Sequence, residues 1–150
     1  MSTSTDRKVT TDLIETLEDG SRGFAEAAER LAGTDRPDLA TRFAEFGRQR
    51  AAFSQELESM AAAYGDDIDE NGSVAAAVHR GWMSIKDAVT GSSASGVLDV
   101  ARSGEEHAVS EYRKALDSDI SIDLRSTVER QFAAVNIVAD EVKTLQASLS

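Results

Sequence analysis

The sequence predicts an all-α protein, folded as an antiparallel four-helix bundle with a short fifth helix that crosses it. Apolar residues recur along the chain in alternating steps of three and four, which places them on one stripe of each helix. No stretch alternates apolar and polar residues with the period of two that a half-buried strand shows. Stripes of this kind pack into a common core between antiparallel helices.

The first two helices are expected over residues 12–32 and 37–64. Asp12, with Glu15 three residues later, resembles a capping box, in which side chains bind free backbone N–H groups at the start of a helix. Gly33 suits the position just after a helix. The single proline of the chain opens the second helix, where its missing N–H leaves no hydrogen bond unmade.

Three further helices are expected in the second half of the chain. A short helix over 73–89 follows a polar loop, with Ser73 as its N-cap. A Gly/Ser-rich linker over 91–96 then leads to a helix over 97–116, and a last helix runs from 122 nearly to the C-terminus. The short helix should cross one side or end of the bundle that the four long helices form.

Length and composition fit one domain over residues 11–150, preceded by a disordered tail over 1–10. No stretch reaches the ~20 apolar residues that a membrane span needs, so no membrane partner is expected. The absence of cysteine excludes disulfides and thiolate chemistry, and a soluble cytoplasmic protein is expected. A net charge of −11 opposes binding to nucleic-acid phosphates and suits a cation or a basic partner protein.

Three of the long helices carry a polar residue near mid-length, where the stripe calls for an apolar one. These residues are Arg50, Glu105 and Gln131, and the first helix has Gly20 and Ser21 at the same level. One unpaired buried charge costs roughly 3–5 kcal/mol, so Arg50 needs a carboxylate, and Glu105 is the best candidate. We expect an interior polar layer that fixes the register of the helices. A small-anion site, or exposure of one member by helix rotation, remains as an alternative.

The most distinctive local segment lies on the short helix. His79 and Trp82 are three residues apart and therefore share a face, and Arg80, Gly81 and Lys86 complete the segment. A lone histidine binds metal weakly. We interpret the segment as a packing anchor, with Trp82 sealing one side of the bundle.

Metal sites are expected to be absent, although two patterns in the sequence partly resemble one. Glu105, His107 and Glu111 are weak candidates for a metal, but charged side chains on a helix face are usually only solvated. The loop over 67–72 matches the opening of an EF-hand, yet its twelfth position is Val78, where a bidentate glutamate is required. That loop is therefore interpreted as a turn and a helix cap.

Several segments resemble a bacterial family of ferritin-like four-helix bundles whose shared domain is labelled as of unknown function. The most specific is residues 72–82, supported by Gln49-Arg50, by Gly104-Glu105 and by residues 129–131. The similarity extends from about residue 13 to 145. It implies a ferritin-like bundle, with one long crossover between two antiparallel helix pairs, and it implies no particular activity.

The wider ferritin-like class implies a di-iron site, with one Glu from each of two helices and a Glu-x-x-His pair from each of the other two. Only Glu105 matches a ligand position of that pattern. The other ligand positions hold different residues: Ser21 or Gly20, Arg50, Phe53, Gln131 and Ala134. Arginine does not ligate metals at neutral pH, and its charge repels a cation. The conventional di-iron site is therefore expected to be lost.

We expect a non-enzymatic protein with a structural, interaction or stress-related role, without a cofactor. A homodimer is expected as the commonest closed assembly. Two other functions remain open. One is a metal-handling protein that binds or oxidises iron at a degenerate site. The other is a small-ligand carrier with a cavity around Gly20, Gly47 and Gly104, where missing side chains leave room.

Overall fold

The computed structural model describes residues 3–62 and 93–149, and this part of the chain consists of four α-helices without a strand. The helices are α1 (Thr3–Ala32), α2 (Asp38–Ala62), α5 (Ala94–Leu116) and α6 (Ile122–Leu149). The all-helical prediction is confirmed for these residues. None of the four helices is both long enough and apolar enough to cross a membrane.

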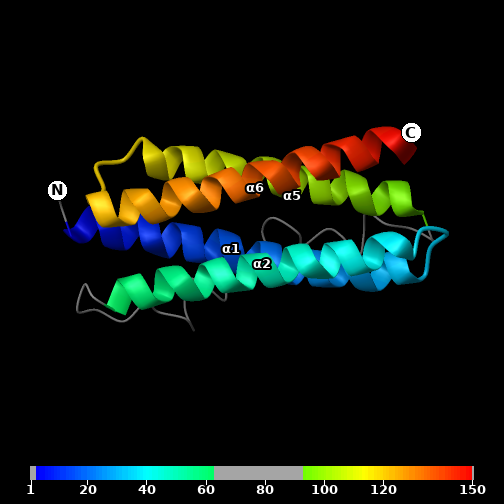
Figure 1. The fold of residues 1–150 in the computed structure, drawn as a ribbon, viewed down its shortest axis with the longest axis horizontal. Coiled ribbons are helices and arrows are strands. Elements are labelled where there is room, and N and C mark those ends of the chain that lie inside the picture. The colour runs from blue at the N-terminus through cyan, green and yellow to red at the C-terminus, as the bar shows by residue number, and fades with distance from the viewer. Residues whose placement is uncertain (1–2, 63–92, 150) are drawn as a thin grey trace.

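The helices form two antiparallel hairpins that lie side by side, α1 with α2 and α5 with α6 (Figure 1). Helices α1 and α6 run in one direction, and α2 and α5 run in the other. The end of α2 and the start of α5 therefore lie at opposite ends of the bundle. Close helix packing occurs within each hairpin and between α1 and α5, whereas α2 and α6 approach each other at few positions.

The N-terminus differs from the prediction, because α1 begins at Thr3. The first ten residues were expected to form a disordered tail, and this is wrong from Thr3 onward. Val9 is buried one turn before Leu13 and extends the apolar stripe of α1 towards the N-terminus. Asp6 is also buried, and its Oδ1 accepts a hydrogen bond from the Ser121 backbone N–H at 2.9 Å. A single valine among polar residues is too weak a signal to reveal this extension.

The starts of α5 and α6 follow from their capping residues. Helix α5 begins a turn earlier than expected, because the Ser93 Oγ accepts a hydrogen bond from the Gly96 N–H at 3.3 Å and caps the helix within the Gly/Ser-rich linker. Helix α6 begins at Ile122 as predicted, with the Ser121 Oγ accepting from the Leu124 N–H at 3.3 Å. The predicted short helix over 73–89 lies outside the described residues.

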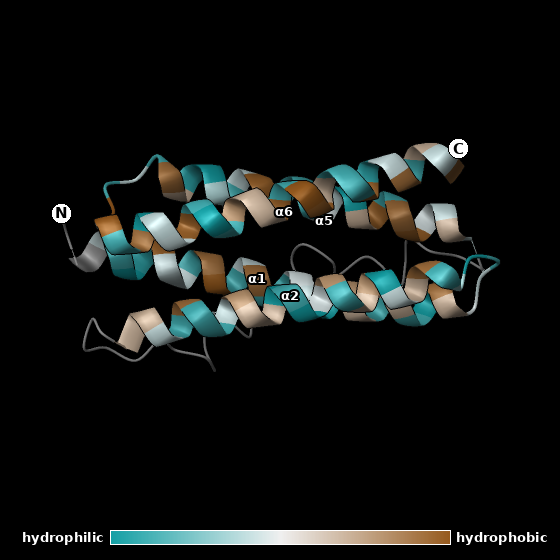
Figure 2. Ribbon diagram, in the orientation of Figure 1, coloured by the Kyte–Doolittle hydropathy of each residue, from teal (hydrophilic) through white to brown (hydrophobic). Residues whose placement is uncertain are grey.

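The core consists of two apolar clusters, one towards each end of the bundle. Around each helix, apolar residues alternate with polar ones, as Figure 2 shows. One cluster contains Phe24, Phe43 and Phe46, and the Phe24 ring meets the other two edge-on at centroid distances of 5.6 and 5.4 Å. The other cluster includes Leu17 and Leu57. The polar residues that were predicted at mid-length lie in or next to the zone between these clusters.

Candidate functional site

The centre of the bundle holds a buried ion pair between diagonally opposed helices. Arg50 of α2 donates from Nη1 to Oε1 of Glu105 at 2.6 Å and from Nη2 to Oε2 at 2.5 Å. The side chains are only 1% and 2% exposed. Two parallel charge-assisted hydrogen bonds make this a strong and orientation-specific contact. The structure thus contains the pair that the interrupted stripes predicted.

The Arg50 side chain lies next to the glycine of α1 at the same level. A Cβ placed on Gly20 would lie 3.6 Å from the Arg50 Nη1, which is an ordinary van der Waals contact. The Phe24 ring lies beneath the guanidinium, with its centroid 5.2 Å from the Arg50 Cζ. Ser21, which was also assigned to the buried layer, is only half-buried. Because each residue turns the helix by about 100°, Gly20 faces the ion pair and its neighbour points elsewhere.

A second polar group lies beside the ion pair and centres on Gln131. The Tyr112 hydroxyl donates to the Gln131 Oε1 at 2.7 Å. The Gln131 Nε2 donates to the Glu56 Oε1 at 2.8 Å and to the Phe53 carbonyl at 3.3 Å. Arg130 binds the same Glu56 carboxylate from the surface. Gln131 is buried and hydrogen-bonded as expected, with α2 and Tyr112 as its partners.

Tyr112 is fully buried and uncharged at neutral pH. Burial raises the pKa of its phenol, and the carboxylates of Glu56 and Glu105 act in the same direction. The nearby cations of Arg50 and Arg130 act in the opposite direction and do not offset the burial. The hydroxyl therefore keeps its proton and remains a hydrogen-bond donor.

The sequence pattern missed several members of this polar interior. Tyr112 occupies an apolar position of its stripe and reads as ordinary core, and Glu56 and Arg130 read as solvated surface charges. Ser54 is fully buried and donates to the Glu18 Oε1 at 2.7 Å, which joins α2 to α1. The predicted apolar stripe passes through the neighbouring Phe53, so the spacing gave no signal for Ser54.

The weak metal candidates are not brought together. Glu105 points inward to Arg50, whereas His107 is exposed and Glu111 accepts from Lys114 at 3.3 Å. In the part of the chain that the structure describes, no group of three or more His, Cys, Asp or Glu side chains gathers as a metal site would require. At the centre of the bundle, the Arg50 guanidinium engages both oxygens of the Glu105 carboxylate, so this carboxylate is already used by a cation.

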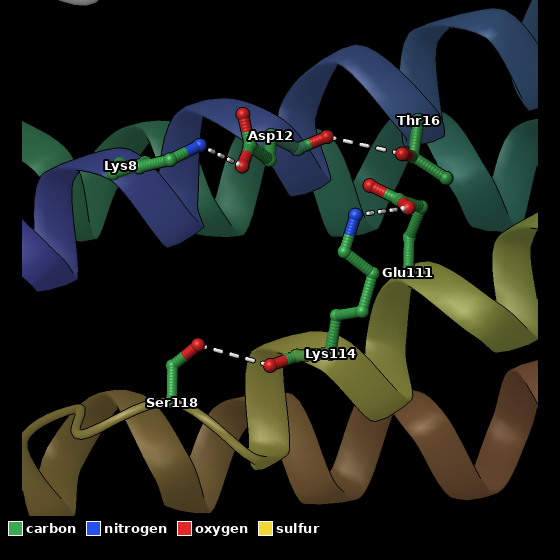
Figure 3. A network of polar contacts seen from close by, with 6 residues as sticks. All are labelled: Lys8, Asp12, Thr16, Glu111, Lys114 and Ser118. Carbon is green, nitrogen blue, oxygen red and sulfur yellow. Dashed lines mark hydrogen bonds and ion pairs between the residues drawn. The ribbon is translucent and has the colours of Figure 1, made fainter.

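A groove of about 590 Å³ lies between α1 and α5, and both apolar and charged residues of the two helices line it. Figure 3 shows the charged side chains of the two walls. Lys8 donates to the Asp12 Oδ2 at 2.8 Å on one wall, and this contact raises the pKa of Lys8. Lys114 donates to the Glu111 Oε2 at 3.3 Å on the other wall. Each lysine is thus paired with a carboxylate on its own helix, and surface pairs of this kind contribute little to stability.

The predicted signature of the crossing helix cannot be placed on this framework. His79, Arg80, Gly81, Trp82 and Lys86 all lie outside the described residues. The interior polar residues of the four long helices therefore form the candidate site.

A family model described as "Domain of unknown function (DUF2383)" matches residues 8–118. The chain belongs to the DUF2383 family. The matched region contains Arg50, Glu105 and Tyr112, and it ends before α6, so Gln131 lies beyond it. No curated protein matches the chain. DUF2383 membership therefore places the central ion pair inside a family domain and attaches no activity to it.

Proposed function

We propose that this chain is a non-enzymatic, ferritin-like bundle protein with a structural or interaction role, in which an internal ion pair stands where a di-iron site would lie. The observation that carries the proposal is the pairing of Arg50 with Glu105 at the centre of the bundle. The resemblance noted from the sequence adds a stress-related role, and the absence of cysteine suits the cytoplasm.

The arrangement of the helices supports the ferritin-like part of the proposal. Ferritin-like bundles consist of two antiparallel helix pairs joined by one long crossover. Here the two hairpins are joined through residues 63–93, which connect opposite ends of the bundle (Figure 1). Helices α2 and α5 consequently run in parallel, as that topology requires.

The ion pair is chemically incompatible with a metal at the same place. Arginine keeps its charge at any physiological pH, so the guanidinium cannot give way by losing a proton. A metal ion bound to Glu105 would have to displace two short hydrogen bonds and would lie close to a second buried cation. Electrostatic repulsion therefore opposes both iron binding and iron oxidation at this centre.

The polar groups of the centre bond to one another, which favours a structural role over catalysis. Arg50 binds Glu105, Tyr112 binds Gln131, and Gln131 binds Glu56. A catalytic acid, base or nucleophile needs a free position aimed at a substrate. A buried network in which each member is hydrogen-bonded instead rigidifies a core and specifies one packing.

Incubation with ferrous iron in air tests the proposal against the metal-handling alternative. We expect the wild-type chain to leave the rate of iron oxidation at that of buffer alone and to bind no stoichiometric iron. The Arg50→Glu variant places a second carboxylate against Glu105 and should gain divalent-metal binding. Arg42→Glu makes the same charge change at an exposed position and serves as the control. Stoichiometric iron binding or faster iron oxidation by the wild type would contradict the proposal.

A further inference from the structure

The groove between the first turns of α1 and the end of α5 has an apolar floor, formed by Val9, Leu13 and Ala115. These side chains are 7%, 1% and 4% exposed, and all three belong to one apolar cluster of the core. Helix α1 packs less closely on α5 than on α2, and Ala115 adds little bulk to the α5 side. The groove holds about 590 Å³, which is within the range of about 300–1,000 Å³ that small-molecule sites show.

The carboxylates of the two walls are less exposed than the lysines that pair with them. On the α1 wall, the side chain of Asp12 is 43% exposed and that of Lys8 is 76% exposed. On the α5 wall, Glu111 is 18% exposed and Lys114 is 73% exposed (Figure 3). Long lysine side chains keep their charged ends in water. A ligand that lies on the floor therefore meets carboxylate oxygens before it meets ammonium groups.

Each of these carboxylates uses one oxygen for its lysine. Lys8 donates to the Asp12 Oδ2 at 2.8 Å, and Lys114 donates to the Glu111 Oε2 at 3.3 Å. Within the described residues, no hydrogen bond reaches the Asp12 Oδ1 or the Glu111 Oε1. An ionised carboxylate has about four acceptor positions, so both groups can accept from a further N–H donor.

The charges around the groove favour a positive ligand. The pKa of Lys8 is raised, chiefly by its hydrogen bond and charge contact with Asp12, and Glu111 and Glu15 act in the same direction against the opposing effect of burial. With Lys114, these groups are three carboxylates and two lysines. The chain as a whole carries a net charge of −11. One added positive charge balances the local excess, whereas an added anion increases the repulsion.

We propose that this groove binds a small organic cation, a primary alkylammonium with a single positive charge. Its apolar chain lies on the floor, and its ammonium group donates to a free oxygen of the wall carboxylates, Asp12 and Glu111. Burial of the chain supplies affinity, and the carboxylates select the charge of the head group. This inference goes beyond the proposed function, and it depends neither on the central ion pair nor on the absence of a metal.

Three eight-carbon probes that differ only in their head group test the inference on the full chain: octylammonium, octanol and octanoate. The readout is the shift of backbone amide signals in two-dimensional NMR at 150 mM sodium chloride, which screens attraction to distant surface charges. We expect octylammonium to give saturable shifts at Val9, Leu13 and Ala115. It should bind at least tenfold more tightly than octanoate, with octanol between them. Octanoate binding as tight as octylammonium, or shifts that do not saturate or lie away from the groove, would overturn the inference.

Substitutions on the two walls assign the binding to the groove. The double variant Asp12→Asn with Glu111→Gln removes both carboxylates, so it should bind octylammonium at least tenfold more weakly and octanoate more tightly. Lys8→Met removes a competing cation and should tighten octylammonium binding. Glu106→Gln, the control, makes the same change at an exposed α5 carboxylate that does not line the groove, and should leave binding unaltered.

Each of these variants can overturn the inference. Wild-type affinity for octylammonium in the folded double variant would exclude the wall carboxylates as the site. An equal loss of affinity in Glu106→Gln would show that the probe responds only to net charge. If the double variant does not fold, Lys8→Met decides the case, because weaker octylammonium binding by this variant contradicts the proposed charge selection.

Discussion

At the scale of single residues, the bundle tolerates a buried arginine because its neighbours use the guanidinium fully. Glu105 accepts hydrogen bonds from the two terminal nitrogens, the Phe24 ring lies against one face, and Gly20 lies beside Nη1 without crowding it. A buried ion pair contributes little net stability compared with apolar side chains of similar volume. Its value lies in specificity, because only one register of α2 against α5 brings the two charges together.

Replacing one partner of the central pair should cost far more stability than replacing both. Arg50→Met strands a buried carboxylate, and Glu105→Met strands a buried cation, so each should lower the free energy of unfolding by about 3–5 kcal/mol. The double variant should recover much of that loss. Arg42→Met removes an equally well-formed but exposed pair and should cost about 0–1 kcal/mol. Urea melts of the four variants give the coupling, and additive effects at Arg50 and Glu105 would show that they do not act as partners.

Tyr112 should make the folded state sensitive to alkali. Its pKa is raised by burial, so on raising the pH the unfolded chain loses the phenolic proton first. The stability that the protonated Tyr112 gives the folded state is therefore complete below the ordinary tyrosine pKa of about 10 and declines above it. Tyr112→Phe should cost about 1–3 kcal/mol at pH 7 by leaving the Gln131 carbonyl without its donor, and should flatten the decline above pH 10. Urea melts from pH 7 to 11 measure both effects. Phenolate absorbance from folded Tyr112 near pH 10 would contradict the expectation.

At the scale of helices, two glycines in helix interiors have opposite roles. A Cβ on Gly47 of α2 would lie 3.2 Å from the Ser21 carbonyl oxygen of α1, so this glycine sets how closely the two helices approach. A Cβ on Gly20 would make only ordinary contacts, at 3.6 and 3.7 Å, with the Arg50 side chain. The first position needs glycine for packing, and the second accommodates a methyl group.

Alanine at these two positions should therefore change stability in opposite directions. Gly20→Ala should stabilise the protein by about 0.5–1 kcal/mol, because alanine loses less backbone entropy in a helix than glycine. Gly47→Ala gains the same propensity but forces α1 and α2 apart, at a cost of about 1–3 kcal/mol, and should destabilise. Thermal melts of the two variants provide the comparison, each serving as the control for the other. Equal stabilisation by both would show that the α1–α2 contact at Gly47 is looser than the structure indicates.

The elements show why parts of this architecture could be predicted from sequence. The stripes revealed the four long helices, and two charges interrupting them revealed the Arg50–Glu105 pair, because a buried charge has few acceptable partners. Gln131 was assigned to the interior without its partners, since an amide bonds equally well to a phenol, a carboxylate or a carbonyl. The start of α1 was missed because its polar first turns are held by tertiary contacts, such as that of Asp6 with Ser121, which have no local signal.

At the scale of the whole molecule, the fold is a balance between a compact core and an excess of negative charge. The chain carries 27 acidic and 16 basic residues, giving a net charge of −11. Ion pairs such as Lys8 with Asp12 and Arg102 with Glu106 lie within one helix and are exposed. Pairs of that kind add little to stability, so the net repulsion between the helices is the dominant long-range electrostatic effect.

Added salt should therefore stabilise this protein. The Debye length falls from about 30 Å at 0.01 M to about 10 Å at 0.1 M, which screens repulsion between charges on different helices. The Arg50–Glu105 contact, at 2.5 and 2.6 Å and shielded from water, is screened far less. The Tm should rise as sodium chloride increases from 10 to 150 mM, by a few degrees if roughly 1 kcal/mol of repulsion is relieved. Variants that neutralise exposed carboxylates, such as Glu29→Gln with Glu129→Gln, should have a higher Tm at 10 mM salt and a smaller rise in Tm on adding salt. A Tm that falls with salt would mean that the surface ion pairs outweigh the net charge.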